Sequence, residues 1–185
     1  MIRSRHGPVT PRHTISTLFV VRSVRDCARG YLVVGITRYP CALGRSGIIV
    51  AKREGDGGTP RAALPLRRLF LKPGKGSHPR TLLKRKIMTR QDAWCDDVHD
   101  RRYNRLIKRP EGQAEERLWR SDHLYDIIVE LGWNDSPVRR GRGSAIFWHL
   151  PRAGLTPTAG CIATPRDVFL KVLPRLSRRA RIIVL

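Results

Sequence analysis

Short runs of β-branched, aliphatic and aromatic residues, broken by Gly and Pro, restrict the fold of this chain more than any other feature. Runs of this kind predict strands, and they lie at residues 14–24, 31–40, 47–60, 62–72, 123–134, 143–149 and 180–185. The first two flank the turn sequence RDCARG and predict an antiparallel pair. In the fourth, Pro65 favours a sheet edge or a bend, because proline has no N–H to donate to a neighbouring strand. The pattern predicts a mostly β fold.

One helix is predicted shortly after Cys161. Thr164 fits the N-cap, Pro165 the first helical position, and Asp167 a capping-box spacing. Apolar residues then recur at helical spacing and predict the packing face: Val168, Phe169, Val172, Leu173 and Leu176. Pro174 limits or bends this helix.

The middle of the chain, residues 73–122, is rich in Pro and charge and shows little periodicity. A structureless segment of this length is uncommon inside a compact domain. We therefore expect a long loop or functional insertion, or a segment with short elements of its own. The length of 185 residues fits one domain, and we expect it to span residues 14–185, after a flexible basic arm at 1–13.

The charge balance is strongly basic, with 37 Lys and Arg against 15 Asp and Glu and a formal net charge of +22. Such a field attracts polyanions in general, including nucleic acid and anionic surfaces. The basic residues are scattered, and no nucleic-acid-binding motif is present, so we expect no nucleic-acid partner. Cys27, Cys41, Cys95 and Cys161 lack the paired spacing of a zinc site, and we expect no metal.

The N-terminal region superficially resembles a secretory signal, because basic residues precede the apolar run ISTLFVV. This run is at the lower limit of length for the apolar core (h-region) of a signal peptide, and it contains Ser and Thr. No A-x-A cleavage pattern follows it. It is better interpreted as a strand. No apolar stretch approaches the length of a membrane span.

His149 and Cys161 are the strongest candidates for chemistry. His149 lies at the end of a predicted strand, and eleven residues, the last of them Gly160, separate it from Cys161. A neighbouring imidazole and a helix N-terminus both lower the pKa of a thiol, and backbone N–H groups beside Cys161 can stabilise an oxyanion. The pattern fits a cysteine acyl-transfer site. The spacing alone leaves another interpretation open, in which Cys161 is a small buried apolar residue.

The sequence HLPRAGLTPTAGC resembles the signature of the L,D-transpeptidases of the YkuD type, in which a strand His is followed by Ser/Thr-x-Gly-Cys. The flanking GRGSAIFWH, RSGIIVAKREGDGGTP and WCDDVHDRRYNRLI resemble the small single-domain members, and the resemblance covers roughly residues 14–185. It implies a β-sandwich-like catalytic domain with a few short helices, one directly after the catalytic Cys. It also implies an enzyme that cross-links peptidoglycan stem peptides without a cofactor.

The resemblance also implies roles for residues of this chain. Cys161 is expected to be the nucleophile and His149 the base, with Gly160 and Cys161 N–H groups at the oxyanion and Thr158 bracing the loop. Many members carry Arg two residues after the Cys, where this chain has Ala163. Arg142 and Arg166 are therefore the candidates for binding a substrate carboxylate, although either can equally be a surface residue.

In the middle segment, Trp94, Tyr103 and Asn104 are candidates for the cleft wall, or else they pin the segment to the core. The carboxylates Asp96, Asp97 and Asp122 are each expected to pair with an Arg, and one near the cleft can bind the acceptor amine.

The expected reaction is a 1-3 link from L-Ala to diaminopimelate, favoured over a 3-3 link. A carboxypeptidase or amidase of the same fold and a non-enzymatic polyanion-binding module remain alternatives. The family implies a periplasmic or cell-envelope location and acylation of Cys161 by carbapenems.

Overall fold

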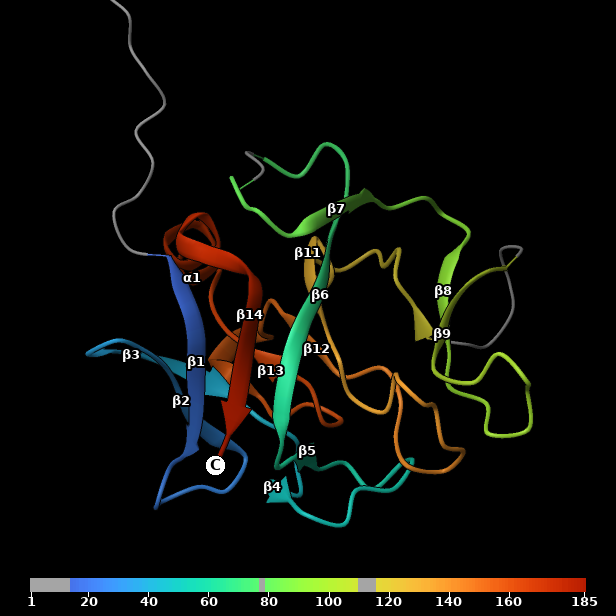
Figure 1. The fold of residues 1–185 in the computed structure, drawn as a ribbon, viewed down its shortest axis with the longest axis horizontal. Coiled ribbons are helices and arrows are strands. Elements are labelled where there is room, and N and C mark those ends of the chain that lie inside the picture. The colour runs from blue at the N-terminus through green and yellow to red at the C-terminus, as the bar shows by residue number, and fades with distance from the viewer. Residues whose placement is uncertain (1–13, 77–78, 110–115) are drawn as a thin grey trace, which may run out of the picture.

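The computed structural model describes residues 14–76, 79–109 and 116–185, and these residues form a mostly β fold, as the sequence predicts. The basic arm expected at residues 1–13 lies outside the described residues. A nine-stranded sheet dominates the structure (Figure 1). Its strands are, in spatial order, β11 (Ile127–Leu131), β12 (Phe147–His149), β13 (Ile162–Ala163), β3 (Thr37–Ala42), β2 (Arg29–Val34), β1 (Ile15–Arg22), β14 (Leu176–Val184), β6 (Ala63–Leu71) and β7 (Lys84–Ile87).

The sheet closes on itself, because β11 pairs with β6 as well as with β12. Most neighbours are antiparallel, but β1 runs parallel to β14, β12 to β13, and β6 to β7. Alternate side chains of these strands build an apolar core that includes fully buried Leu18, Leu32, Leu64, Val129 and Trp148. Burial of such side chains is the main favourable term in folding.

A short helix, α1 (Arg166–Val172), adds Val168, Phe169 and Val172 to this core. The ring of Phe169 stacks on Trp148 at 4.3 Å between centroids. The apolar face predicted for this helix is therefore confirmed for these three residues, whereas Leu173 and Leu176 are buried but lie beyond the end of the helix. A 3-10 turn at Leu173–Arg175, which contains Pro174, ends the helix before β14 begins.

The start of this helix differs from the prediction. The N-cap is Pro165 and makes no side-chain cap hydrogen bond, so the helix begins one residue later than expected. The prediction of Thr164 as the cap is wrong, because its hydroxyl accepts a 2.7 Å hydrogen bond from the indole N–H of Trp148 inside the core. The two-residue strand β13 also separates Cys161 from the helix.

Two strand predictions need correction. Residues 31–40, expected to be one strand, form a tight hairpin between β2 and β3, with Gly35 at the turn in a left-handed conformation, φ 60°. Of the two alternatives for Pro65, the sheet edge is wrong, because Pro65 lies inside the sheet, at the point where the pairing of β6 with β14 ends. Its missing N–H costs little there, and its carbonyl accepts a 2.7 Å hydrogen bond from Gly132.

The middle segment carries strands of its own. Besides β7, it contains β8 (Asp92–Cys95) and β9 (Arg105–Lys108), which form a three-stranded sheet with β10 (Glu116–Arg117). In Figure 1 β8 and β9 lie to one side of the main sheet. A second apolar cluster, which includes Trp94, Leu118, Tyr125, Phe147 and Cys161, joins this side to the main sheet.

The remaining strands, β4 (Ile48–Ile49) and β5 (Thr59–Pro60), form a short parallel pair. Among the described residues, no helix has both the length and the apolar character needed to cross a bilayer.

Candidate active site

The register between β12 and β13 brings His149 and Cys161 to the same side of the sheet. Trp148 pairs with Ile162 and His149 with Ala163, in parallel. Trp148 and Ile162 face the main core, whereas Phe147 and Cys161 face the second apolar cluster. Since side chains alternate along a strand, His149 and Cys161 share the second face. Side-chain alternation along residues 145–149 predicts Ala145, Phe147 and His149 on one face and Ile146 and Trp148 on the other, and the structure confirms these faces.

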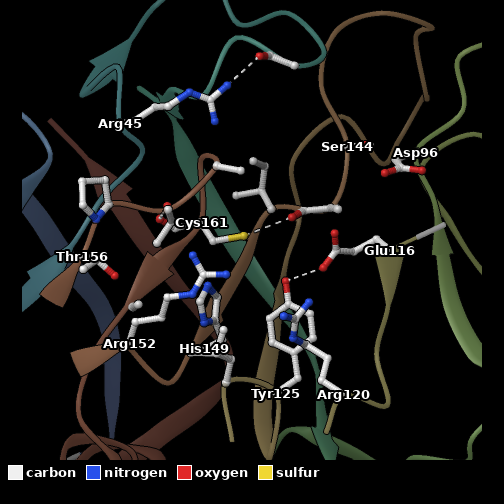
Figure 2. Close-up of a pocket in the computed structure, with 18 of the residues that line it drawn as sticks. Arg45, Asp96, Glu116, Arg120, Tyr125, Ser144, His149, Arg152, Thr156 and Cys161 are labelled. Carbon is white, nitrogen blue, oxygen red and sulfur yellow. Dashed lines mark hydrogen bonds between the residues drawn. The ribbon is translucent and has the colours of Figure 1, made fainter. Parts of the chain in front are cut away.

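His149 and Cys161 line one cleft of about 370 Å³ (Figure 2). Its wall comes from the loop after β3, the loop between β4 and β5, the middle segment, and the loop between His149 and Cys161. Charged and aromatic side chains on this wall include Arg45, Asp96, Glu116, Arg120, Tyr125 and Arg152. The volume suits a peptide-sized ligand.

The sulfur of Cys161 is held between two backbone groups. It donates a hydrogen bond to the carbonyl of Ala145 at 3.2 Å and accepts one from the N–H of Phe147 at 3.3 Å. Burial raises the pKa of Cys161 to about 12, and the charge of Glu116 acts in the same direction, whereas the Phe147 N–H opposes it. The unliganded protein therefore holds a neutral thiol at neutral pH.

The imidazole of His149 is held as a neutral base. Burial lowers its pKa to about 4, an effect that the charges of Arg120 and Arg152 strengthen. Its Nδ1 lies 2.7 Å from the carbonyl of Leu150. A carbonyl only accepts, so the proton of the neutral ring sits on Nδ1, which leaves the lone pair on Nε2. The rings of His149 and Tyr125 pack in a T-shaped arrangement, with centroids 5.2 Å apart.

The loop before Cys161 is fixed by Thr158. Its hydroxyl donates to the carbonyl of Cys161 at 2.7 Å and accepts from the N–H of Gly160 at 3.1 Å. The backbone N–H of Thr158 donates a hydrogen bond to the carbonyl of Leu43, and its carbonyl accepts one from the N–H of Arg45, just after β3. Gly160 has φ 137°, and a Cβ there would lie 2.8 Å from the carbonyl oxygen of Gly58. Only glycine fits this position without strain.

The two arginines expected to bind a carboxylate lie away from the cleft wall. The side chain of Arg142 is exposed, and its backbone carbonyl accepts a hydrogen bond from the indole N–H of Trp133. Arg166 donates to the carbonyl of Lys75. Neither lines the cleft. Three other arginines do: Arg45, Arg120 and Arg152.

Trp94, Tyr103 and Asn104 are buried behind the wall rather than on it. Asn104 accepts hydrogen bonds from the indole of Trp94 at 2.9 Å and from the N–H of Ala145 at 3.2 Å. Because the carbonyl of Ala145 accepts the hydrogen bond of the Cys161 thiol, Asn104 affects the site indirectly, through the backbone of Ala145. The hydroxyl of Tyr103 donates to Glu54. This placement fits the interpretation that these side chains pin the segment to the core.

Of the three carboxylates considered, Asp122 pairs with Arg120 at 2.7 Å, as expected. Asp96 lines the cleft, and Asp97 accepts from the N–H of His99.

Sequence reasoning missed Arg45, Arg120, Arg152, Glu116 and Tyr125. Arg152 lies within the loop between His149 and Cys161, which was a usable signal, whereas nothing in the sequence separates the other four from their surroundings.

The described residues contain no group of three or more His, Cys, Asp or Glu side chains arranged to hold a metal ion. All four cysteines are free thiols, with Cys27 exposed and the others buried.

Comparison with known proteins gave one family match. No curated protein and no solved structure matched the chain. Residues 24–184 match the family model YkuD, described as the L,D-transpeptidase catalytic domain. This range is nearly the whole chain and contains both His149 and Cys161. The chain therefore belongs to the YkuD family of L,D-transpeptidase catalytic domains.

Proposed function

We propose that this protein is a peptidoglycan L,D-transpeptidase in which Cys161 is the nucleophile and His149 the general base. We treat residues 14–185 as its catalytic domain, with the middle segment, residues 73–122, as an insertion beside the cleft. The observation that carries the proposal is the placement of His149 and Cys161 on one face of neighbouring strands, in a shared cleft, within a chain of this family.

The protonation states favour attack by a neutral thiol with general-base help. The thiol proton passes to Nε2 of His149 as sulfur bonds to the carbonyl carbon of an L-configured donor residue. The carbon–nitrogen bond to the following D-residue then breaks, and His149 returns the proton to the leaving amine. The product is a thioester on Cys161, and the pair starts and ends neutral.

The second half-reaction runs in the reverse sense. A neutral acceptor amine attacks the thioester carbonyl, a carbon–nitrogen bond forms, and the carbon–sulfur bond breaks. The amine proton passes through His149 to the departing sulfur. Transfer to water instead of an amine would make the protein a hydrolase.

The oxyanion that forms in both steps needs N–H donors in the cleft. We assign this role to the N–H of Cys161. The N–H of Gly160, also expected to serve, donates to the hydroxyl of Thr158. Gly160 and Thr158 therefore act by shaping the backbone of the nucleophile.

We propose diaminopimelate-type stem peptides as substrates and a 1-3 link, from the first L-Ala of the donor to diaminopimelate, as the product. This assignment follows the resemblance to small single-domain members of the family. The family is typical of the cell envelope, and we propose that location. The basic surface would draw the enzyme to an anionic wall.

The test incubates the protein and its Cys161→Ala variant with diaminopimelate-containing muropeptides and identifies the products by mass spectrometry. Cross-linked dimers from the wild type alone are expected, and fragmentation places the link at 1-3 or 3-3. Shortened monomers alone would identify a hydrolase. If both proteins were inactive and the wild type bound polyanions in a salt-sensitive way, the protein would be a binding module and not an enzyme.

A second assay does not depend on the natural substrate. A carbapenem is expected to acylate the wild type and to leave Cys161→Ala unmodified, as seen by intact-protein mass spectrometry. A wild-type protein with no adduct would contradict this expectation.

A further inference from the structure

The cleft of this basic protein has one acidic side. Arg45 and Arg152 lie on one side of Cys161 in Figure 2, and Glu116 and Asp96 lie on the other, contributed by the middle segment. Two other cations of the wall are neutralised by their own carboxylates: Lys52 pairs with Asp56 and Arg120 with Asp122, each at 2.7 Å. Because one side of the cleft is basic and the other acidic, the cleft suits a ligand that carries both a carboxylate and an ammonium group.

Glu116 is held in place by a neutral donor. The hydroxyl of Tyr125 donates to its Oε1 at 2.7 Å, and this bond fixes the carboxylate without cancelling its charge. No described residue donates to the second oxygen, Oε2. The other glutamate of the cleft, Glu54, differs in this respect, because the N–H of Gly55 engages its Oε1 and the hydroxyl of Tyr103 its Oε2.

Glu116 is also close enough to the reacting groups to affect them. Its negative charge helps to raise the pKa of Cys161, although burial is the larger cause. Tyr125, to which it is bonded, packs against the ring of His149. A carboxylate in this position disfavours the thiolate, so its placement gives no help to the first half-reaction and needs another explanation.

We propose that Glu116 is the acceptor subsite, where Oε2 receives the ammonium group of the acceptor strand. This inference rests on the proposed function. A primary ammonium forms a short, charge-assisted hydrogen bond with a carboxylate oxygen. Arg45 and Arg152, across the cleft, would then face the carboxylates of the stem peptides.

The bound ammonium must lose one proton to solvent before it can attack. The neutral amine then bonds to the thioester carbonyl carbon, its second proton passes through His149, and the carbon–sulfur bond breaks. Glu116 takes no proton in this scheme. Its part is to raise the local concentration of the amine over that of water, which sets the ratio of cross-linking to hydrolysis.

The experiment measures that ratio. With a fixed donor muropeptide and an increasing concentration of a diaminopimelate-containing acceptor peptide, mass spectrometry quantifies cross-linked and hydrolysed donor. In Glu116→Gln, the acceptor concentration for half-maximal cross-linking should rise about tenfold or more, because a charge-assisted hydrogen bond is lost. The rate of thioester formation with donor alone should not fall, because the lost charge is one that helps to raise the pKa of Cys161.

Tyr125→Phe keeps the ring beside His149 and removes the hydrogen bond to Glu116, so it should shift the same ratio by a smaller factor. It also carries the test if thermal unfolding shows that Glu116→Gln does not fold. The matched control is Asp167→Asn, an exposed carboxylate on α1 that pairs with Lys171, and it should leave the ratio unchanged.

Two results would overturn the acceptor subsite: a Glu116→Gln variant with the acceptor dependence of the wild type, or one that slows thioester formation as much as transfer. Failure of the wild type to form a thioester with any donor would instead defeat the proposed function, and this inference with it.

Discussion

The hydroxyl of Thr158 donates a 2.7 Å hydrogen bond to the carbonyl oxygen of Cys161, the residue proposed to attack the substrate. The same hydroxyl accepts from the N–H of Gly160. Thr158 is itself tied to the sheet through Leu43 and Arg45. One side chain therefore fixes the backbone on both sides of the nucleophile without touching the sulfur.

Thr158→Val keeps the shape of the side chain and removes both hydrogen bonds. We expect the rate of Cys161 acylation by a carbapenem to fall by roughly tenfold or more, since small displacements of a nucleophile are costly. Stability should fall by about 1–3 kcal/mol, because buried groups lose their partner. Thr158→Ser retains the hydroxyl and should acylate within about threefold of wild type. A valine variant as fast as the serine variant would contradict the bracing role.

Local patterns in the sequence predicted the parts of this fold that depend on local chemistry. The β-branched runs located most strands, and the alternation at residues 145–149 gave the correct faces. The expected cap failed because tertiary packing overrides local propensity: the Thr164 hydroxyl is engaged by Trp148, which is distant in sequence. Closure of the sheet through β6 and β11 leaves no trace in either strand's own sequence.

The candidate site likewise contains residues that the sequence identifies and residues that only the folded structure identifies. His149 and Cys161 stand out by residue type, spacing and family resemblance. Arg45, Arg120 and Arg152 do not, because 37 Lys and Arg are scattered along the chain and only the folded structure selects the few that reach the cleft. Glu116 becomes recognisable only beside Tyr125, nine residues later in sequence.

The neutral state of Cys161 predicts an unusual response to thiol reagents. Burial raises its pKa to about 12, and only the thiolate reacts with iodoacetamide. The rate of Cys161 alkylation should therefore increase roughly tenfold per pH unit from pH 7 to 10 without a plateau. Peptide mapping by mass spectrometry follows each cysteine separately, with exposed Cys27 as the internal reference. A plateau below pH 8 would indicate a preformed thiolate–imidazolium pair instead.

The buried imidazole of His149 predicts a loss of stability in mild acid. The folded protein keeps this ring neutral down to pH about 4, whereas in the unfolded chain the ring takes a proton near pH 6.5. Between these values the unfolded chain binds more protons, so the free energy of unfolding falls as the pH drops, by about 3 kcal/mol from this group. Above pH 6.5 the contribution is complete.

Urea unfolding of the wild type and of His149→Gln, at steps between pH 4 and pH 7, isolates this contribution. The variant lacks the titrating group, so its free energy of unfolding should depend less steeply on pH over this window. Parallel curves for the two proteins would show that His149 does not titrate in the way its burial requires.

Gly160 and Gly35 form a matched pair for testing the backbone before the nucleophile. Both have positive φ, 137° and 60°, but a Cβ at Gly35 meets nothing within 4 Å, whereas at Gly160 it would lie 2.8 Å from the carbonyl of Gly58. Gly35→Ala should cost about 1 kcal/mol of stability, from left-handed strain alone, and should leave acylation of Cys161 unchanged. Gly160→Ala should cost more and also slow acylation strongly, because the turn that presents Cys161 must shift. Chemical denaturation and carbapenem adduct formation measure the two effects separately. A Gly160→Ala variant whose Cys161 is acylated at the wild-type rate would contradict this prediction. The reactivity of the thiol would then not depend on the geometry of residues 158–161.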